Sequence, residues 1–378
     1  MASISGQTAI VGVGYTAFTP NSGKSVLSLA AEACKNAIED AGLSPQQIDG
    51  IGCYSLYGDS VSPGELGNAL GAENLHASLN LNSGGDTPPV LIGYAASLVY
   101  GGMANYMVVY RALNGRSGTR IGGTGMGGGA AQRMGGSSQF SAIYGFSGPP
   151  AGYAMHGQAY LARFGKTNRD FATTAVMMRR HAQKNPRAIM YGRPMTIEDH
   201  QNSRWIVHPF RLFDNCVEVD AAVAMVVTTK RRAQSLKHRP VYIAGSAHGE
   251  GEGSPGDSWA RWSGPPAMKM AGVTAKDVDV ACISDDYTFT FLSQLEDFGF
   301  CKKGEGPDYV TAGRATYGGS VVCNPHGGQL SEGFVHDMNQ VGEAVVQLRG
   351  EAGDRQVPNA EIALVSGTFG HSCAILTR

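Results

Sequence analysis

The segment AGLSPQQIDGIGCYS (41–55) decides the fold, because its pattern returns late in the chain as AGVTAKDVDVACISD (271–285). Each copy contains a helix end, a polar turn and the entry into a strand. A pattern that occurs twice at this length indicates a repeated structural unit. The chain is therefore predicted to contain two similar α/β halves.

The segments around the two copies extend the correspondence. TAIVGVG (8–14) and PVYIAGSAHG (240–249) are apolar strand runs that precede the copies, and AVAMVVTT (222–229) and CAILTR (373–378) are strand runs that close each half. Strands and helices alternate, which predicts largely parallel sheets covered by helices, with ligands bound beyond the carboxyl ends of the strands. We expect an N-terminal half over 1–236 and a C-terminal half over 237–378.

Residues 115–215 interrupt this alternation. The segment begins with a glycine-rich tract, GGTGMGGG (122–129), and continues with helical patterns at 152–165 and 170–185. An interruption of this kind within an otherwise regular half indicates an insertion. We expect a mostly helical cap here.

Composition and charge narrow the classes of function. The formal net charge is -1, so no long-range field attracts nucleic acid or an anionic membrane. No stretch approaches the roughly 20 apolar residues that span a bilayer, and the N-terminus has no secretion-signal pattern. The seven cysteines are scattered and form no CxxC pair, which favours reduced thiols and a cytoplasmic location.

Several short motifs fail on inspection. GVGYTA (12–17) is similar to a dinucleotide fingerprint, but a loop with proline separates it from the helix, and SGKS (22–25) has Phe18 where a phosphate loop needs glycine. LNSGGD (81–86) lacks the first glycine of a serine-hydrolase turn. No histidines have the local spacing of metal ligands, so we expect no metal and no cofactor.

The chain as a whole resembles the thiolase superfamily, in its lipid-transfer or sterol-carrier-protein-type branch. The segments that carry this resemblance are HAQKNPRAIMYGRPMTIEDH (181–200), HPFRLFDNCVEVDAAVA (208–224), LEDFGFCKKGEG (295–306), NPHGGQLSEG (324–333) and EAVVQLRGEAGDRQV (343–357). The resemblance implies an α/β thiolase fold, with a duplicated five-layered αβαβα core. It also implies a homodimer formed by the N-terminal halves and acyl-CoA substrates, whose CoA moiety enters as part of the substrate.

The catalytic residues of the family are missing at the matching positions. The turn LNSGG places Leu81 at the position of the nucleophilic cysteine, and Phe334 replaces the catalytic histidine. The loop that usually reads Asn-Glu-Ala-Phe is Ser284 to Tyr287, and the late cysteine falls near Val365 or Ser366. Thiolase chemistry needs a thiolate nucleophile, so covalent catalysis of that kind is not expected.

A branch with the same loss is similar to this sequence: the steroid side-chain retro-aldolases, which cleave a β-hydroxyacyl-CoA with tyrosines in place of cysteine. Those tyrosines match Ser284 and Phe334, and both are absent here. Retro-aldol cleavage needs only a base and an oxyanion site, which other polar groups can supply. The resemblance also implies a small partner protein of OB-fold and zinc-ribbon type.

The remaining polar groups on the predicted strand-to-helix loops are the candidates for catalysis. They are Asp285, Tyr287, His326, His336 and His371, with His326 favoured as base or oxyanion donor. Each has a structural alternative: a loop-locking hydrogen bond for His326 and His371, helix capping for Asp285 together with Asp286, and packing for Tyr287. The candidate substrate-binding positions are Leu81, Ser83, Ser284, Gly327, Gly328 and Phe334, and the two glycines would allow close backbone approach to a thioester.

The leading hypothesis is a lyase that cleaves a bulky, steroid or aromatic, β-hydroxyacyl-CoA by a retro-aldol reaction. Two alternatives stay open. One is acyl transfer or a Claisen step with another nucleophile, and the other is an inert thiolase-fold subunit that carries or scaffolds an acyl-CoA for an active partner.

Overall fold

The computed structural model describes residues 4–56, 58–118, 120, 139–140, 143–144, 146 and 148–378. The glycine-rich tract at 122–129 lies outside the described residues. The strands are β1 Thr8–Tyr15, β2 Gly50–Ser55, β3 Ala77–Asn82, β4 Tyr106–Asn114, β5 Trp205–Val207, β6 Phe210–Arg211, β7 Asp220–Thr229, β8 Val241–His248, β9 Val280–Cys282, β10 Val322–Cys323, β11 Ile362–Ser366 and β12 Ser372–Thr377. The helices are α1 Val26–Asp40, α2 Pro63–Leu70, α3 Pro88–Tyr100, α5 Gly148–Phe164, α6 Asn168–Ala182, α7 Ile197–Gln201, α8 Lys230–Ala233, α9 Ala260–Ala271, α10 Thr288–Asp297, α11 Gly306–Thr311, α12 Gly328–Ser331 and α13 Met338–Arg349.

Ten strands form one sheet with the order β10-β9-β11-β12-β8-β1-β7-β4-β2-β3. The order is symmetric about its centre. Going outward, the N-terminal half contributes β1, β7, β4, β2 and β3, and the C-terminal half contributes β8, β12, β11, β9 and β10. The two halves join through two residue pairs, Ala9 with Tyr242 and Ile10 with Val241. The duplication predicted from the sequence is therefore visible in the topology. The division at 236 falls between α8 and β8 and stays a prediction.

The sheet is mixed, and the expectation of largely parallel sheets is wrong. Strand β2 runs parallel to β3 and β4, and β9 runs parallel to β10 and β11. By contrast, β7 is antiparallel to both β1 and β4, and β12 is antiparallel to both β11 and β8. The closing strand of each half thus reverses direction, which the alternation of strand and helix in the sequence cannot reveal.

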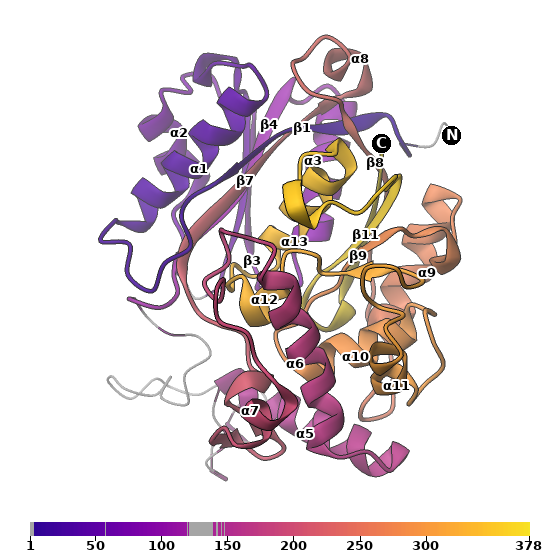
Figure 1. The fold of residues 1–378 in the computed structure, drawn as a ribbon. Coiled ribbons are helices and arrows are strands. Elements are labelled where there is room, and N and C mark those ends of the chain that lie inside the picture. Colours follow the sequence, from indigo (N-terminus) through magenta and orange to yellow (C-terminus); the bar gives the residue numbers. More distant parts are fainter. Residues whose placement is uncertain are drawn as a thin grey trace.

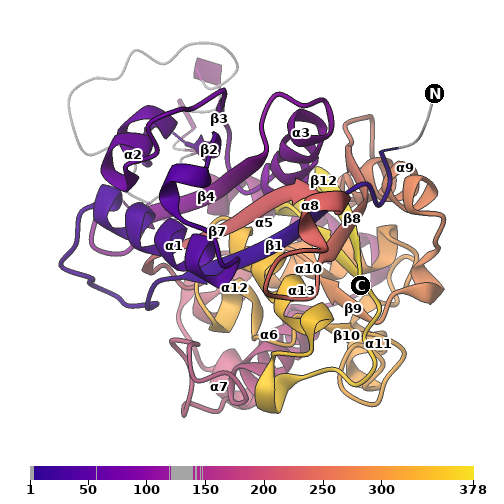
Figure 2. The same cartoon turned by 90° about the horizontal axis from the view of Figure 1, so that it is seen from above.

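Three apolar cores divide the molecule into five layers (Figures 1 and 2). Helices α3 and α13 lie between the two halves of the sheet, α1 and α2 cover the outer face of the first half, and α9 and α10 cover that of the second. Alternate residues of β4 pack into two different cores. Met107 and Val109 face the central core, while Val108 and Tyr110 face the outer one. This is the five-layered αβαβα arrangement expected from the sequence.

The glycines of the GVG segment hold α1 close to β1. A Cβ at Gly12 would lie 2.1 Å from the carbonyl oxygen of Ala37, and one at Gly14 would lie 2.2 Å from that of Ala33. Both carbonyls belong to α1. These two glycines therefore serve helix–strand packing.

The predicted cap is present as α5, α6 and α7, which lie below the sheet in the view of Figure 1. Residues of α5 and α6, among them Tyr160, Phe171 and Met178, share one apolar core with α10. The predicted helices at 152–165 and 170–185 are confirmed by α5 and α6. The cap is thus part of the outer core of the C-terminal half, where it packs against α10.

Candidate functional site

Gly85 lies in the turn between β3 and α3, where loops from several strands meet. A Cβ at Gly85 would lie 2.3 Å from Oγ1 of Thr368 and 2.8 Å from Oδ2 of Asp337, so this backbone is tightly packed against two other loops. The sequence placed Leu81 in this turn, at the nucleophile position, but Leu81 lies in β3, before the turn. Leu81 pairs with Tyr54 inside β3, because the strand continues to Asn82 and the turn only then begins.

The same turn carries a carboxylate. Ser83 donates its hydroxyl to Asp86, with Oγ–Oδ distances of 2.7 and 2.8 Å, and the N–H of Gly84 donates to Oδ1 at 3.0 Å. Ser83 therefore orders the loop rather than standing free. Asp86 is half-buried beside Gly85.

Two further carboxyl groups, Asp286 and Asp337, lie in the same place and share one amide. Nε2 of Gln329 lies 2.7 Å from Oδ1 of Asp286 and 2.7 Å from Oδ1 of Asp337. Oδ2 of Asp337 accepts the hydroxyls of Ser284 and Thr368, each at 3.0 Å. We call Asp86, Asp286 and Asp337 the acid cluster. It joins the loops after β9 and β11 to the starts of α3 and α13, at the strand ends where the sequence predicted a site.

Burial sets the protonation of this cluster. It raises the pKa of Asp286 to about 6, with the charge of Asp86 adding to the rise and hydrogen bonds from Thr368 and Gln329 opposing it. Burial and the charge of Asp286 together raise the pKa of Asp337 well above its usual range. At neutral pH the cluster therefore holds one buried carboxylate beside one buried carboxylic acid.

The backbone is strained at the same point. His336 and Asp337 have φ values of 46° and 63°, a region that residues with a side chain seldom occupy. Two such residues in succession, at the start of α13, are typical of a functional site held in place by its surroundings. The hydroxyl of Tyr54 contributes to this support, since it donates to the carbonyl oxygen of His336 at 2.5 Å.

Asp285 has a different role from Asp286. Its carboxylate accepts the backbone N–H groups of Gln329 (2.8 Å) and Leu330 (3.2 Å), at the start of α12, and the side-chain amide of Gln340 (3.0 Å). Burial raises the pKa of Asp285 to about 8, and the two backbone donors oppose that rise. The capping alternative is therefore the one that the geometry favours, although the capped helix is α12 and not the helix that follows Asp285.

His336 is held as a neutral imidazole by a buried arginine. Arg111 lies wholly buried in β4, and its Nε and Nη2 lie 3.1 and 2.7 Å from Nδ1 of His336. A guanidinium only donates, so Nδ1 accepts and the ring proton stays on Nε2. Burial and the charge of Arg111 lower the pKa of His336 well below its usual value. The ring also meets Phe334 edge-on, with centroids 4.5 Å apart.

His326 lies in another environment. It is fully buried, its ring nitrogens have no hydrogen-bond partner among the described residues, and the nearest ionic group is Glu332, with Oε2 3.6 Å from Nε2. Burial lowers its pKa, and the other charges acting on it belong to Glu343, Arg187 and Arg355. The structure therefore does not bring His326 to the acid cluster.

The two glycines after His326 contact protein atoms. A Cβ at Gly327 (φ 102°) would lie 2.7 Å from the Cβ of Ala182, and one at Gly328 (φ 61°) would lie 2.0 Å from Oδ2 of Asp285. Packing against α6 and the capping carboxylate accounts for both glycines. Close approach to a ligand is not needed to explain them.

An aromatic residue of the cap completes the site, and the sequence analysis missed it. Tyr153 in α5 is partly buried, and its ring packs against Tyr287 (centroids 4.9 Å apart) and Phe369 (5.5 Å). Burial, followed by the charges of Asp286, Asp86 and Asp337, raises its pKa. The charges of the acid cluster therefore act on the phenol. Tyr287 instead stacks on Phe210 at 5.2 Å, which favours the packing alternative for Tyr287.

His371 lies on the other side of Phe369. Its ring stacks on Trp259, with centroids 4.3 Å apart and an interplanar angle of 16°. Burial lowers its pKa, while the charge of Asp86 opposes that effect. His371 is therefore close to the acid cluster and lies beside His248, at the end of β8 and the start of β12.

No thiol replaces the missing nucleophile. Burial raises the pKa of all seven cysteines, so that none is a thiolate at neutral pH. The cysteine nearest the acid cluster is Cys216, whose N–H donates to the carbonyl oxygen of Asp286 at 2.9 Å. The charge of Asp286 adds to the rise in its pKa. Cys323 is fully buried in β10.

The fold and the site together define a class: an α/β enzyme of the duplicated five-layered type, with a cluster of acid–base groups beside the turn before α3 and no thiolate among its cysteines. Such a site can move protons but cannot form the acyl-enzyme of a thiolase.

The comparisons with known proteins agree with this class. The family model described as "Thiolase C-terminal domain-like" matches residues 252–377. The chain is 41% identical to "17-hydroxy-3-oxo-4-pregnene-20-carboxyl-CoA lyase" of Mycobacterium tuberculosis and 37% identical to "Steroid side-chain-cleaving aldolase" of Thermomonospora curvata, over 97% of each chain. A solved structure described as "Ltp2-ChsH2(DUF35) aldolase" superposes with a TM-score of 0.91, at 36% identity, over 100% of this chain and 99% of that one. The chain belongs to the thiolase superfamily, in its branch of steroid side-chain-cleaving aldolases, and is a thiolase-fold lyase.

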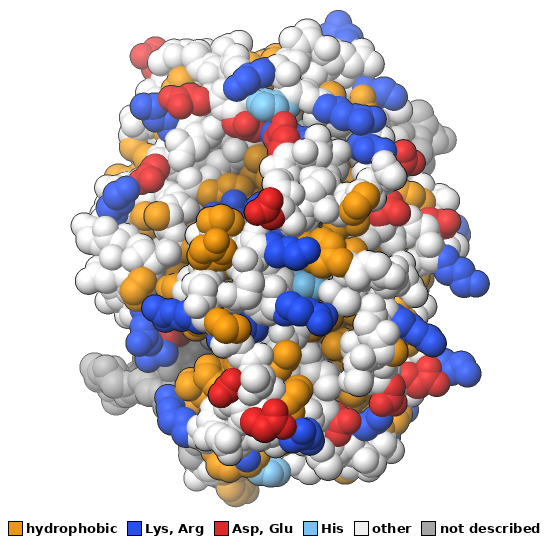
Figure 3. Space-filling view, viewed as in Figure 1, with side chains coloured by type: hydrophobic (Ala, Val, Ile, Leu, Met, Phe, Trp, Pro, Cys, Tyr) orange, Lys and Arg blue, Asp and Glu red, His pale blue; other side chains and the backbone are white. Residues whose placement is uncertain are grey.

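Two surface observations complete the description. On the face shown in Figure 3, basic and acidic side chains are interspersed, with apolar side chains between them. Within the described residues, no helix has both the length and the apolar character needed to cross a membrane.

Proposed function

We propose that the chain cleaves the Cα–Cβ bond of a β-hydroxyacyl-CoA whose acyl group is a steroid side chain or a group of similar bulk. The acid cluster beside Gly85 is the observation that carries this proposal. The names of the relatives, a pregnene carboxyl-CoA lyase and a steroid side-chain-cleaving aldolase, support the choice of substrate.

In the proposed reaction Asp286 is the base. Its carboxylate takes the proton from the β-hydroxyl, the C–O bond becomes a carbonyl, and the Cα–Cβ bond breaks with its electron pair passing to the thioester as an enolate. The enolate then takes a proton at Cα, which leaves a carbonyl product and a shorter acyl-CoA. No covalent intermediate and no cofactor are required, and the CoA moiety is part of the substrate.

Neutral donors suit the enolate oxygen. The protonated carboxyl of Asp337, the Nε2–H of His336 and the phenol of Tyr153 carry no charge at neutral pH, and donors already fixed in a buried site stabilise developing negative charge. We assign the proton returned to Cα to Tyr153, because its phenol lies within reach of the charges of the acid cluster and is neutral at neutral pH. Ser284 and Phe334, which match the tyrosines of the retro-aldolase branch, would shape the site.

A partner protein is part of the proposal. The solved relative is described as an aldolase of two named components, the second labelled DUF35. We therefore expect this chain to work as a homodimer with a small OB-fold and zinc-ribbon protein of the DUF35 kind, in the cytoplasm.

The test uses the purified chain, alone and with a co-expressed DUF35-type protein, supplied with a steroid 3-hydroxyacyl-CoA. We expect release of a ketone or aldehyde and a shortened acyl-CoA, without a mass increase on the protein. An acylated protein, found by mass spectrometry, would instead support acyl transfer, and the C216A variant would show whether the nearest thiol carries the acyl group. Binding of the CoA ester without turnover in either form would identify a carrier subunit.

A further inference from the structure

Two histidines that lack the local spacing of metal ligands come together at the ends of neighbouring strands. His248 ends β8 and His371 precedes β12, and these two strands are neighbours in which His248 pairs with Ser372. The N–H of Gly249 donates to the carbonyl oxygen of His371 at 2.8 Å, which fixes the two backbones together. Two imidazoles that are far apart in the sequence therefore lie side by side, with centroids 6.2 Å apart.

A carboxylate joins them. Glu250, two residues after His248, places Oε1 3.3 Å from Nε2 of His248. One ligand atom from each of His248, Glu250 and His371 lies within 4.8 Å of the others. Ligand atoms around a tetrahedral zinc ion are about 3.4 Å apart, as follows from bond lengths near 2.0–2.1 Å. His248 and Glu250 are exposed and can rotate to close the remaining gap, whereas the ring of His371 is held by its stacking on Trp259.

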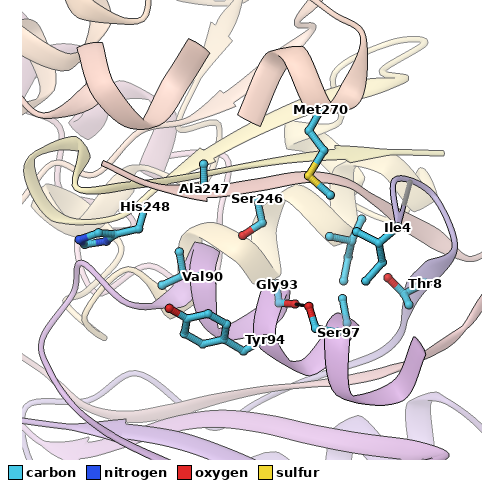
Figure 4. A pocket seen from close by; sticks show the side chains of 12 residues that line it. Ile4, Thr8, Val90, Gly93, Tyr94, Ser97, Ser246, Ala247, His248 and Met270 are labelled. Atoms are coloured by element: carbon cyan, nitrogen blue, oxygen red, sulfur yellow. Dashed lines mark hydrogen bonds between the residues drawn. The ribbon is translucent and has the colours of Figure 1, made fainter. Parts of the chain in front are cut away.

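His248 and Glu250 are exposed, so water can reach the three side chains and serve as a fourth ligand. His248 lies at one end of a pocket between α3 and β8 that is also lined by Val90, Tyr94, Ser246 and Met270 (Figure 4). In that view its imidazole points away from the end formed by Ile4 and Thr8. Two imidazoles, one carboxylate and an open position form the ligand set that zinc takes in sites with an exchangeable water.

We propose that His248, Glu250 and His371 bind one divalent transition-metal ion of the zinc type. The ion would tie the loop after β8 to the start of β12, at the mouth of the pocket along α3. This site shares no ligand with the acid cluster, although the charge of Asp86 reaches His371, and it does not depend on the function proposed above.

The experiment titrates the untagged, chelator-treated chain with Zn²⁺ by calorimetry and, in parallel, with Co²⁺ by absorption spectroscopy. We expect one equivalent of Zn²⁺ per chain and the visible bands of low-coordinate Co²⁺. The variants H248A, E250Q and H371A should each weaken binding by at least about tenfold, since even residues outside the ligand shell typically contribute 10–100-fold. The controls H76A and E252Q alter exposed residues outside the proposed ligand set and should bind as the unaltered chain does.

Two results would overturn the proposal. One is the absence of one-equivalent binding by the unaltered chain. The other is unchanged affinity in the double variant H248A/H371A, which keeps all seven cysteines and would show that the ion binds elsewhere. If H371A fails to fold because it loses the contact with Trp259, E250Q and H248A decide the question, since both residues are exposed.

Discussion

Asp286 differs from the other buried acids in its freedom to act as a base. Asp285 is held by the start of α12, and the pKa of Asp337 is raised well above its usual range. Asp286 has a pKa of about 6 and accepts the amide of Gln329 on one oxygen. It is therefore ionised at neutral pH and becomes protonated as the pH falls through about 6.

The D286N variant tests this role. We expect kcat/KM to fall by about 10²–10⁴-fold, the usual contribution of a positioned base. For the unaltered enzyme, kcat/KM should decrease below a pH of about 6, because protonated Asp286 cannot accept the hydroxyl proton. The exposed D308N variant is the control and should keep the full rate and the same pH profile. If the D286N enzyme still lost kcat/KM below a pH of about 6, Asp286 would not be the base.

Tyr153 allows a cleaner substitution, because only its hydroxyl is proposed to act. In Y153F the ring keeps its contacts with Tyr287 and Phe369, so the melting temperature should stay the same. We expect kcat to fall by about 10²-fold with little change in KM, since the phenol would act in the proton-transfer step. The exposed Y191F serves as the matched control. An unaltered kcat in Y153F would assign Tyr153 to packing alone.

Individual site residues were predictable only where the loops that carry them follow predicted strands. The segment from Ser284 to Tyr287 and the region of Phe334 and His336 lie where the repeat placed them, since parallel strands end at one edge. Tyr153 was missed because it lies in a cap helix, where an aromatic residue reads as core packing. His326 was favoured because glycines follow it, but those glycines meet Ala182 and Asp285.

At the scale of elements, the start of α3 is the most constrained part of the site. The G85A variant adds a Cβ that would lie 2.3 Å from Thr368 Oγ1 and 2.8 Å from Asp337 Oδ2. We expect a loss of about 1–3 kcal/mol in the free energy of unfolding, as for overpacked cores, together with a loss of activity. Chemical denaturation and the lyase assay measure the two effects.

A matched control exists in α2. A Cβ at Gly64 has no heavy atom within 4 Å, so G64A should stabilise the chain by about 0.4–1 kcal/mol through the unfolded state. If G85A were as well tolerated as G64A, the tight packing of the α3 turn would be disproved.

Element boundaries and strand directions were predicted unequally. The strand predicted at 8–14 agrees closely with β1, because an apolar run marks it. The direction of β7 was not predictable, since it follows the whole cap and nothing local records on which side the chain returns. The turn LNSGG was also placed too early, because its first two residues, Leu81 and Asn82, belong to β3.

At the scale of the whole molecule, the distribution of thiols is a direct test of the fold. Cys34, Cys53, Cys282, Cys323 and Cys373 are buried, whereas Cys216 and Cys301 are partly accessible. We expect the native chain to react slowly with a thiol reagent and at no more than those two positions, since burial raises the pKa of both. All seven cysteines should react after denaturation. Rapid labelling of a buried position, located by peptide mapping, would contradict the described layers.

The duplicated architecture was the most predictable feature, because two copies of one pattern imply two copies of one unit. The five layers follow, since each half needs helices on both faces of its strands. The junction of the halves through two residue pairs between β1 and β8 left no trace in the sequence.

The packing around Gly85 limits what can be introduced there. A cysteine at this position would have its Cβ pressed against Thr368 and Asp337. Phe334, whose ring holds no proton acceptor, could not take up the thiol proton. One substitution at Gly85 would therefore not convert this lyase into a condensing enzyme.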